Sequence, residues 1–397
     1  MKKIVTCCLH AAFAATISHA AVTGYGMSFV GDHNQISEAD PLPSDFYFFN
    51  SILSTQDAAD ANSATIAFPG GASDSMIYSP DILFVYYSPV FSSAAGLFAT
   101  YQPGNYAYTM TSGTLNGLSG TLNMPDSQLP VEAPRLNLGD FTSMQDAPAN
   151  TALTVGWPSF TYGGNLPLHV INFTTVDRTE ALYSFGATGD NGVFNSTTIP
   201  ASQMKSGHRY FFYLEYEAYS VNNSGMGGAS GSVVALRRTL GYYNVKAEPG
   251  TIAGQMVLAD SVRNLGEDID IVVKDAANNT ESHTVKLGYD GFYAFDTALT
   301  GNVNVSFKGR HWLTTVVSEI DTSIGQDNID PVLRNGDCDG SDLVNTDDYL
   351  ILNDHFDTTL GDAGYDKRAD LDDNYYVNTD DYLILSNNFD EAGEELP

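Results

Sequence analysis

The sequence lacks the cysteines that a disulfide framework needs. Only three are present, and two of them, Cys7 and Cys8, lie within residues 1–20. Those residues have a basic start, an apolar run and small residues shortly before Ala21, a pattern that predicts a secretory signal peptide. Its removal leaves Cys338 as the only cysteine, so we expect no intramolecular disulfide and a fold stabilised by packed cores and bound metal.

Basic residues and long apolar runs are also scarce. The chain has 17 Lys and Arg against 48 Asp and Glu, a formal net charge of −31. This balance argues against nucleic acid as a partner, because phosphate backbones are held by basic side chains. After the signal peptide, no stretch approaches the ~18 apolar residues of a membrane helix. We therefore expect no transmembrane segment and a protein that is secreted, either extracellular or at the cell surface.

Aromatic and turn-forming residues, in contrast, are abundant. The sequence contains 23 Tyr, 21 Phe and 36 Gly, and short alternating runs such as residues 82–86 and 106–110 predict strands separated by turns. We expect a mainly β fold of tandem β-sandwich domains with a small α-helical module at the C-terminus. The expected units are a signal peptide (1–20), a β-domain of unknown type (21–133), two β-sandwiches (134–245 and 246–332) and a metal-binding module (333–397).

The two expected β-sandwiches resemble known families. The first has Trp157 on an early strand and a Gly-x-x-Tyr entry to a late strand at 207–210, which resemble fibronectin type III and immunoglobulin-like domains. The second has a Phe-Tyr-x-Phe run at 292–295 and a His-Trp-Leu triplet at 311–313, which resemble the carboxypeptidase-regulatory-like β-sandwich. Both resemblances imply a scaffold and not an activity.

An internal repeat with an offset of 33 residues dominates the C-terminal part. Residues 337–352 are echoed by 370–385, and the segment Asn-Thr-Asp-Asp-Tyr-Leu-Ile-Leu is identical in both copies. Between Gly336 and Pro397 there are 18 Asp and Glu residues and only two basic residues. Such a charge density needs either disorder or bound cations. The repeat and its apolar helical stripes favour bound cations over an acidic, disordered tail.

Each copy of the repeat has the ligand spacing of a calcium loop. Calcium takes six to eight oxygen ligands, and a twelve-residue loop supplies them from positions 1, 3, 5, 7, 9 and 12. We therefore expect two calcium ions. The expected ligands of the first are Asp337, Asp339, Ser341, the carbonyl of Leu343, Asn345 and Asp348. Those of the second are Asp370, Asp372, Asn374, the carbonyl of Tyr376, Asn378 and Asp381.

Over residues 336–390 the paired, EF-hand-like loops resemble the duplicated repeats of type I dockerins. The resemblance implies a cohesin-like protein partner. It assigns partner contacts to positions 10 and 11 of the two loops, which are Thr346, Asp347, Thr379 and Asp380. Position 6, where the calcium-loop pattern has Gly for a sharp turn, holds Asp342 and Tyr375 instead. We expect strained loops, with the second loop the weaker because Tyr375 is bulky.

The apolar residues of the repeat predict how the module packs. Val344 and Val377 fall at position 8, where an apolar residue is expected to tie the paired loops together. Tyr349, Leu352 and Phe356 have helical spacing, as do their counterparts 33 residues later, so each helix is expected to bury one face.

No catalytic motif with a defined mechanism is present in the sequence. Four carboxylates, Asp177, Glu180, Glu215 and Glu217, could be paired for glycoside hydrolysis, which needs two acids at a set separation. Two interpretations of function remain. The first is a non-catalytic scaffold or adhesion component attached through the dockerin-like module. The second is a polysaccharide-binding or polysaccharide-degrading component, a glycoside hydrolase in the latter case, carried by the same module. A further alternative is that calcium only folds the module, without any partner.

Overall fold

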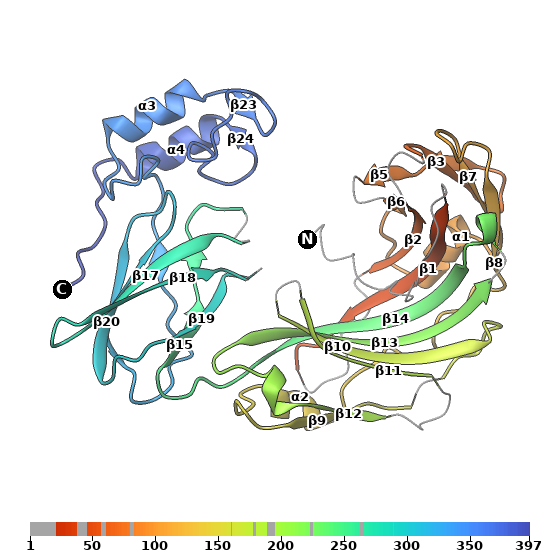
Figure 1. Cartoon of the computed structure of the whole chain (residues 1–397), viewed down its shortest axis with the longest axis horizontal. Coiled ribbons are helices and arrows are strands. Elements are labelled where there is room, and N and C mark those ends of the chain that lie inside the picture. Colours follow the sequence, from red (N-terminus) through yellow and green to blue (C-terminus); the bar gives the residue numbers. More distant parts are fainter. Residues whose placement is uncertain are drawn as a thin grey trace.

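The computed structural model describes residues 21–37, 46–56, 61–79, 83–159, 161–177, 180–188, 195–222, 225–262, 266–288 and 290–397. The predicted signal peptide lies outside these residues. The described chain is mainly β, as the sequence predicts, and its longer helices α3 (Thr346–Asp354) and α4 (Thr379–Asn387) lie together near the C-terminus (Figure 1).

One eight-stranded sheet organises residues 22–244. The first strand of this region pairs in parallel with the last, from Tyr25 opposite Gly231 to Asn34 opposite Leu240, and every other pairing in the sheet is antiparallel. Because the sheet joins both sides of the boundary expected at 133/134, that boundary does not separate two sheets. The strand order is β11 (Glu180–Thr188), β10 (Leu168–Asp177), β13 (Arg209–Asn222), β14 (Gly231–Asn244), β1 (Val22–Asn34), β2 (Phe46–Thr55), β6 (Leu83–Tyr87) and β5 (Ile77–Ser79).

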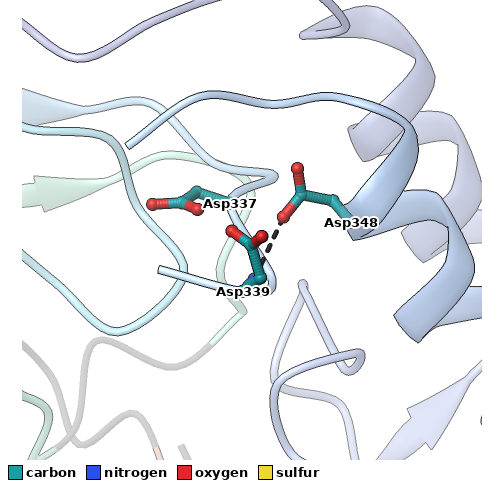
Figure 2. Close-up of side chains that lie close together, drawn as sticks. All are labelled: Asp337, Asp339 and Asp348. Carbon is teal, nitrogen blue, oxygen red and sulfur yellow. Dashed lines mark hydrogen bonds between the residues drawn. The ribbon is translucent and has the colours of Figure 1, made fainter. Parts of the chain in front are cut away.

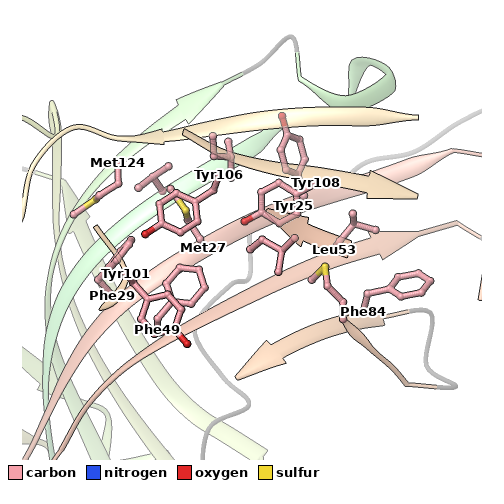
Figure 3. Packing of buried hydrophobic residues seen from close by; sticks show 14 of the residues in the cluster. Tyr25, Met27, Phe29, Phe49, Leu53, Phe84, Tyr101, Tyr106, Tyr108 and Met124 are labelled. Atoms are coloured by element: carbon pink, nitrogen blue, oxygen red, sulfur yellow. The ribbon is translucent and has the colours of Figure 1, made fainter. Parts of the chain in front are cut away.

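A second sheet covers one end of this large sheet. An aromatic core joins them, in which the rings of Phe49 and Tyr106 are stacked with centroids 5.4 Å apart (Figure 3). The ring of Phe98, from helix α1 (Ala94–Thr100), stacks on Phe29 at 5.3 Å. Alternation in β7 (Gly104–Met110) places Tyr106, Tyr108 and Met110 inward, as the sequence pattern predicts. The covering elements are β4 (Ser73–Ser75), β3 (Ala64–Ala67), β7 (Gly104–Met110), β8 (Ser119–Met124), helix α1 (Ala94–Thr100) and the 3₁₀ turn η2 (Met226–Gly228).

A separate core covers the other end of the large sheet. Trp157 is fully buried and stacks on Phe173 with ring centroids 5.8 Å apart, and Phe212 continues the stack at 6.1 Å from Phe173. Trp157 fills a sandwich core, but it directly follows β9 (Leu153–Gly156) instead of lying on the strand, which ends one residue earlier than expected. The covering elements are helix α2 (Asp140–Met144), the strand pair β9 (Leu153–Gly156) and β12 (Ser196–Ile199), and the 3₁₀ turn η1 (Ala201–Gln203).

Residues 251–333 form a further β-sandwich around their own core. Ile271, Val305, Phe307 and Trp312 are completely buried within it. Its last strand, β22 (Val332–Leu333), runs across the boundary expected at 332/333, so this sandwich and the C-terminal module are directly continuous. The strands are β15 (Thr251–Gln255), β16 (Val257–Leu258), β17 (Asp268–Asp275), β18 (Thr280–Lys286), β19 (Phe292–Asp296), β20 (Asn302–Lys308), β21 (Thr315–Asp321) and β22 (Val332–Leu333).

The C-terminal module contains α3, α4 and the short strands β23 (Thr358–Thr359) and β24 (Tyr376–Val377). Each helix starts with a complete capping box, formed by Asn345 with Asp348 in α3 and by Asn378 with Asp381 in α4. The module lies on the preceding sandwich, where Val262 N donates to Asp372 O at 2.8 Å. Thr314 N of the sandwich also donates to Asp342 Oδ1 at 2.7 Å, so both calcium-type loops lie beside the sandwich.

Candidate metal centre

The first loop brings three carboxylates together. Asp337, Asp339 and Asp348 each offer an oxygen, and these oxygens lie within 4.8 Å of one another. Asp348 projects from the start of α3 toward the two residues of the preceding loop, and Asp339 N donates to Asp348 Oδ1 at 3.0 Å (Figure 2). Asp337 and Asp348 are completely buried, whereas Asp339 is exposed. Burial raises the pKa of both buried carboxyls.

Backbone N–H groups donate to these carboxylates and leave one oxygen of Asp337 without a hydrogen-bond partner. Asn345 N donates to Asp348 Oδ2 at 2.7 Å, and Asp342 N donates to Asp337 Oδ2 at 3.0 Å. Asp337 Oδ1 is buried and has no hydrogen-bond partner. A buried carboxylate oxygen without a partner is costly, and a hard cation satisfies it. An all-oxygen donor set with a bare buried oxygen therefore fits calcium.

The second loop repeats this arrangement with deeper burial. Asp370, Asp372 and Asp381 offer oxygens within 4.8 Å of one another, and all three side chains are buried. Leu371 N donates to Asp381 Oδ1 at 2.6 Å, and Tyr375 N donates to Asp370 Oδ2 at 2.9 Å. Burial raises the pKa of Asp381 to about 6. The same three loop positions thus converge in both copies.

Five of the six remaining expected ligands, all except the Tyr376 carbonyl, make the following hydrogen bonds within their loops. Asn345 Oδ1 accepts from Asp347 N at 2.6 Å and Asn378 Oδ1 from Asp380 N at 2.5 Å, so both amides cap helices. Ser341 Oγ donates to the Leu343 carbonyl at 3.3 Å. In the second loop, Asn374 Oδ1 accepts from Tyr376 N at 2.7 Å. The carboxylates at positions 1, 3 and 12 form the cluster, while ligation from positions 5, 7 and 9 stays a prediction.

Position 6 makes the turn that the spacing requires, without glycine. Asp342 has φ of 67° and Tyr375 has φ of 75°, both in the left-handed region. A left-handed conformation costs a residue with a side chain roughly 1–2 kcal/mol. Asp342 offsets part of this cost because its Oδ1 accepts from Thr314 N at 2.7 Å.

The valines at position 8 join the two repeats through one shared side-chain core, as expected, while their backbones bond to other segments. Val344 N donates to Glu391 O at 2.9 Å, and Asp357 N donates to Val377 O at 2.8 Å. Each loop therefore pairs with the segment that follows the helix of the other repeat. Both valine side chains are completely buried in the core of the module.

The expected apolar stripe of each helix is only partly buried. Leu352 and its counterpart Leu385 are 1% exposed. The aromatic positions are exposed instead: Tyr349 by 39%, Phe356 by 44%, and their counterparts Tyr382 and Phe389 by 42% each. In each nine-residue helix the leucine is buried in the core of the module, and the isoleucine before it, Ile351 or Ile384, packs against that core half-buried.

The four expected partner-contact residues are exposed at the helix starts. Thr346 and Asp347 begin α3, and Thr379 and Asp380 begin α4.

The structure also adds a residue that the loop spacing did not reveal. Lys308, at the end of β20, donates from Nζ to Asp337 Oδ2 at 2.7 Å.

Two of the four acids considered for glycoside hydrolysis lie together on β13. Glu217 accepts from Asn172 Nδ2 at 2.9 Å, and Arg238 lies 3.9 Å from Glu215 Oε1. Burial and the nearby Glu215 charge raise the pKa of Glu217 to about 8. Asp177 and Glu180 face each other in the backbone register of β10 and β11, and their side chains lie outside the described part.

No protein-family model and no curated protein matches this chain. Among solved structures, it is similar to a type II cohesin–X-dockerin complex from Acetivibrio cellulolyticus, with 15% identity and a TM-score of 0.30 over 36% of this chain and 97% of that chain. A 1.5-MDa bacterial ice-binding adhesin shares 10% identity at a TM-score of 0.19, covering 79% of this chain and 98% of that chain. The FN1–FN3 domains of chicken CNTN1 share 11% identity at a TM-score of 0.16, covering 73% of this chain and 99% of that chain. At these TM-scores the likenesses carry no argument about this chain.

In the described part of the chain, no helix has the length and the apolar character needed to cross a membrane.

Proposed function

We propose that this chain is a secreted, non-catalytic β-sandwich protein that is attached to a cell surface or an extracellular complex through a calcium-folded, dockerin-like module. One observation carries the proposal: the same three carboxylate positions converge in two loops 33 residues apart. Asp337, Asp348, Asp370 and Asp381 are all completely buried. Buried carboxylates held side by side destabilise a fold unless a cation compensates them.

The helix starts support attachment through a protein partner. Both copies present the same Thr-Asp pair, exposed, beside exposed aromatic side chains. Neither residue of the pair contributes to the carboxylate clusters, so metal binding does not account for their identity. A cohesin-like protein is the partner that the resemblance to dockerins suggests.

The test is the attachment of the mature chain to the envelope fraction of its source organism. We expect attachment in millimolar calcium and its loss in EDTA. The fourfold variant Thr346→Arg, Asp347→Arg, Thr379→Arg, Asp380→Arg should also lose attachment while still binding calcium. Asp354→Arg, at the far end of α3, is the control for added positive charge because Asp354 is also exposed. Equal attachment of the fourfold variant and the wild-type chain would contradict the proposed role of the helix starts.

A polysaccharide-directed role is the second candidate function. The raised pKa of Glu217 favours it, because a carboxyl that stays protonated near neutral pH can serve as a general acid. A glycan array and a hydrolysis screen on the full chain and on Glu217→Gln would test this candidate. Activity that is lost in Glu217→Gln would replace the non-catalytic interpretation, and the absence of binding and of hydrolysis would count against the second candidate.

A further inference from the structure

A lysine of the neighbouring sandwich is built into the first calcium-type loop. Lys308 Nζ makes three hydrogen bonds, to Asp337 Oδ2 at 2.7 Å, to Trp312 O at 2.7 Å and to Gly309 O at 3.2 Å. These three contacts use all the donors of an ammonium group. The Lys308 side chain is 24% exposed and that of Asp337 is completely buried. The lysine is therefore held in one place, and its position follows from the fold of the sandwich.

The ammonium group and the expected ion use different oxygens of the same carboxylate. Asp337 Oδ2 is occupied by Lys308 Nζ and by Asp342 N, whereas Oδ1 has no partner. Lys308 thus leaves the ligand oxygen available. It nevertheless places one positive charge against a carboxylate that is expected to bind a dication.

The second loop has a neutral donor where the first has a charged one. Asp370 Oδ2 accepts from the hydroxyl of Tyr365 at 2.6 Å. Among the ion pairs between described residues, none involves Asp370, Asp372 or Asp381. The two loops have nearly identical ligands. They differ in the charge of the side chain that donates to the aspartate at position 1, which is Lys308 in the first loop and Tyr365 in the second.

We propose that Lys308 is a positioning residue that lowers the calcium affinity of the first loop and makes that affinity depend on the neighbouring sandwich. The inference rests on the proposed calcium function. Calcium affinity in such loops is set by the charge of the ligands and by the rigidity of the site. The ammonium group compensates part of the negative charge of the first loop, so a dication gains less on entering it.

The expected weakness of the second loop has a different origin. Tyr375 raises the free energy of forming that loop because of its left-handed backbone. Lys308 acts on the charge that the ion meets in the first loop. The two effects can be separated by substitution.

The experiment measures calcium affinity by isothermal titration calorimetry in the full mature chain. Asp381→Asn removes the closing carboxylate of the second loop, so that the first loop is measured alone. In that background, Lys308→Met keeps the length and apolar stem of the side chain and removes its charge. We expect calcium to bind about tenfold more tightly, which corresponds to about 1.4 kcal/mol. In the background Asp348→Asn, which leaves only the second loop, Lys308→Met should change the affinity by less than twofold.

Two controls complete the design. Lys286→Met removes an exposed lysine of the same sandwich and should change neither affinity. In the chain with both loops intact, Lys308→Met should shift only one of the two binding steps, so the test holds even if a single-loop variant folds poorly. Calcium binding to the first loop that is unchanged or weaker in Lys308→Met would overturn the inference and leave the proposed function standing. A chain that binds no calcium at either loop would overturn the proposed function itself.

Discussion

The rings of Tyr349 and Tyr382, which occupy the same position in the two repeats, meet edge to face with centroids 6.3 Å apart and an interplanar angle of 70°. Equivalent positions also share the core, as Leu352 and Leu385 do. Even the residues that follow the helices match, because Asp357 and Asp390 have φ values of 62° and 67°. The two halves of the module are therefore alike in backbone as well as in sequence, and each presents a similar surface.

This likeness predicts two equivalent modes of partner binding. A partner that recognises one helix start should also recognise the other after a half-turn of the module. Substituting one pair alone, with Thr346→Arg and Asp347→Arg, should leave most of the affinity, and the same should hold for Thr379→Arg with Asp380→Arg. Surface plasmon resonance against a captured envelope partner would measure this. Loss of all binding in only one of the two variants would show that a single face is used.

The partly buried helices predict different costs for neighbouring leucines. Leu352→Ala and Leu385→Ala should each lower the free energy of unfolding of the module by about 2–5 kcal/mol, because both side chains fill its core. Leu350→Ala and Leu383→Ala are the matched controls. Both residues are 50% exposed, and their substitution should cost less than about 0.5 kcal/mol. Urea unfolding in saturating calcium would measure all four, and equal costs at exposed and buried positions would contradict the packing described.

The left-handed turns predict different outcomes for glycine substitutions at position 6 of the two loops. Tyr375→Gly should stabilise the second loop by roughly 1 kcal/mol, because glycine adopts φ of 75° without steric cost. Asp342→Gly should give little or no gain, since it removes the hydrogen bond from Thr314 N. Thermal unfolding in calcium would compare them. A destabilised Tyr375→Gly chain would show that the tyrosine side chain stabilises the loop by more than its backbone strain costs.

The half-buried Glu217 on β13 predicts a pH dependence for the large sheet. Burial and the Glu215 charge raise the pKa of Glu217 from 4.5 to about 8, so between these pH values the folded chain holds a proton that the unfolded chain has released. Stability from this group therefore falls as the pH rises from about 4.5 to 8. Glu217→Gln keeps an acceptor for Asn172 and should gain stability relative to wild type over the same range. Melting temperatures of the wild-type chain and of Glu217→Gln at pH 5, 6.5 and 8 would test this prediction. A difference between the two chains that stays constant with pH would contradict the raised pKa of Glu217.

The loops could be predicted from sequence because their chemistry is local. Ligand spacing, the helix that follows directly on each loop and the need for a turn at position 6 are all set within or next to twelve consecutive residues. The carboxylate positions 1, 3 and 12 accordingly meet where the spacing places them.

The contacts that the sequence did not reveal join residues far apart in the chain. The pairing of β1 with β14 joins residues about 200 positions apart, so the expected boundary at 133/134 missed it. Lys308 lies 29 residues before Asp337 and belongs to a different unit, so no spacing rule connects them. The cross-pairing of Val344 with Glu391 depends likewise on how the two repeats dock.

Calcium binding by the full mature chain tests the central claim most directly. Isothermal titration calorimetry should give two calcium ions per chain, and Asp348→Asn and Asp381→Asn should each remove one. In calcium at a hundredfold over the dissociation constant, each bound ion should stabilise the module by about 2.7 kcal/mol relative to EDTA. No calcium uptake, together with identical melting curves in calcium and EDTA, would contradict the account.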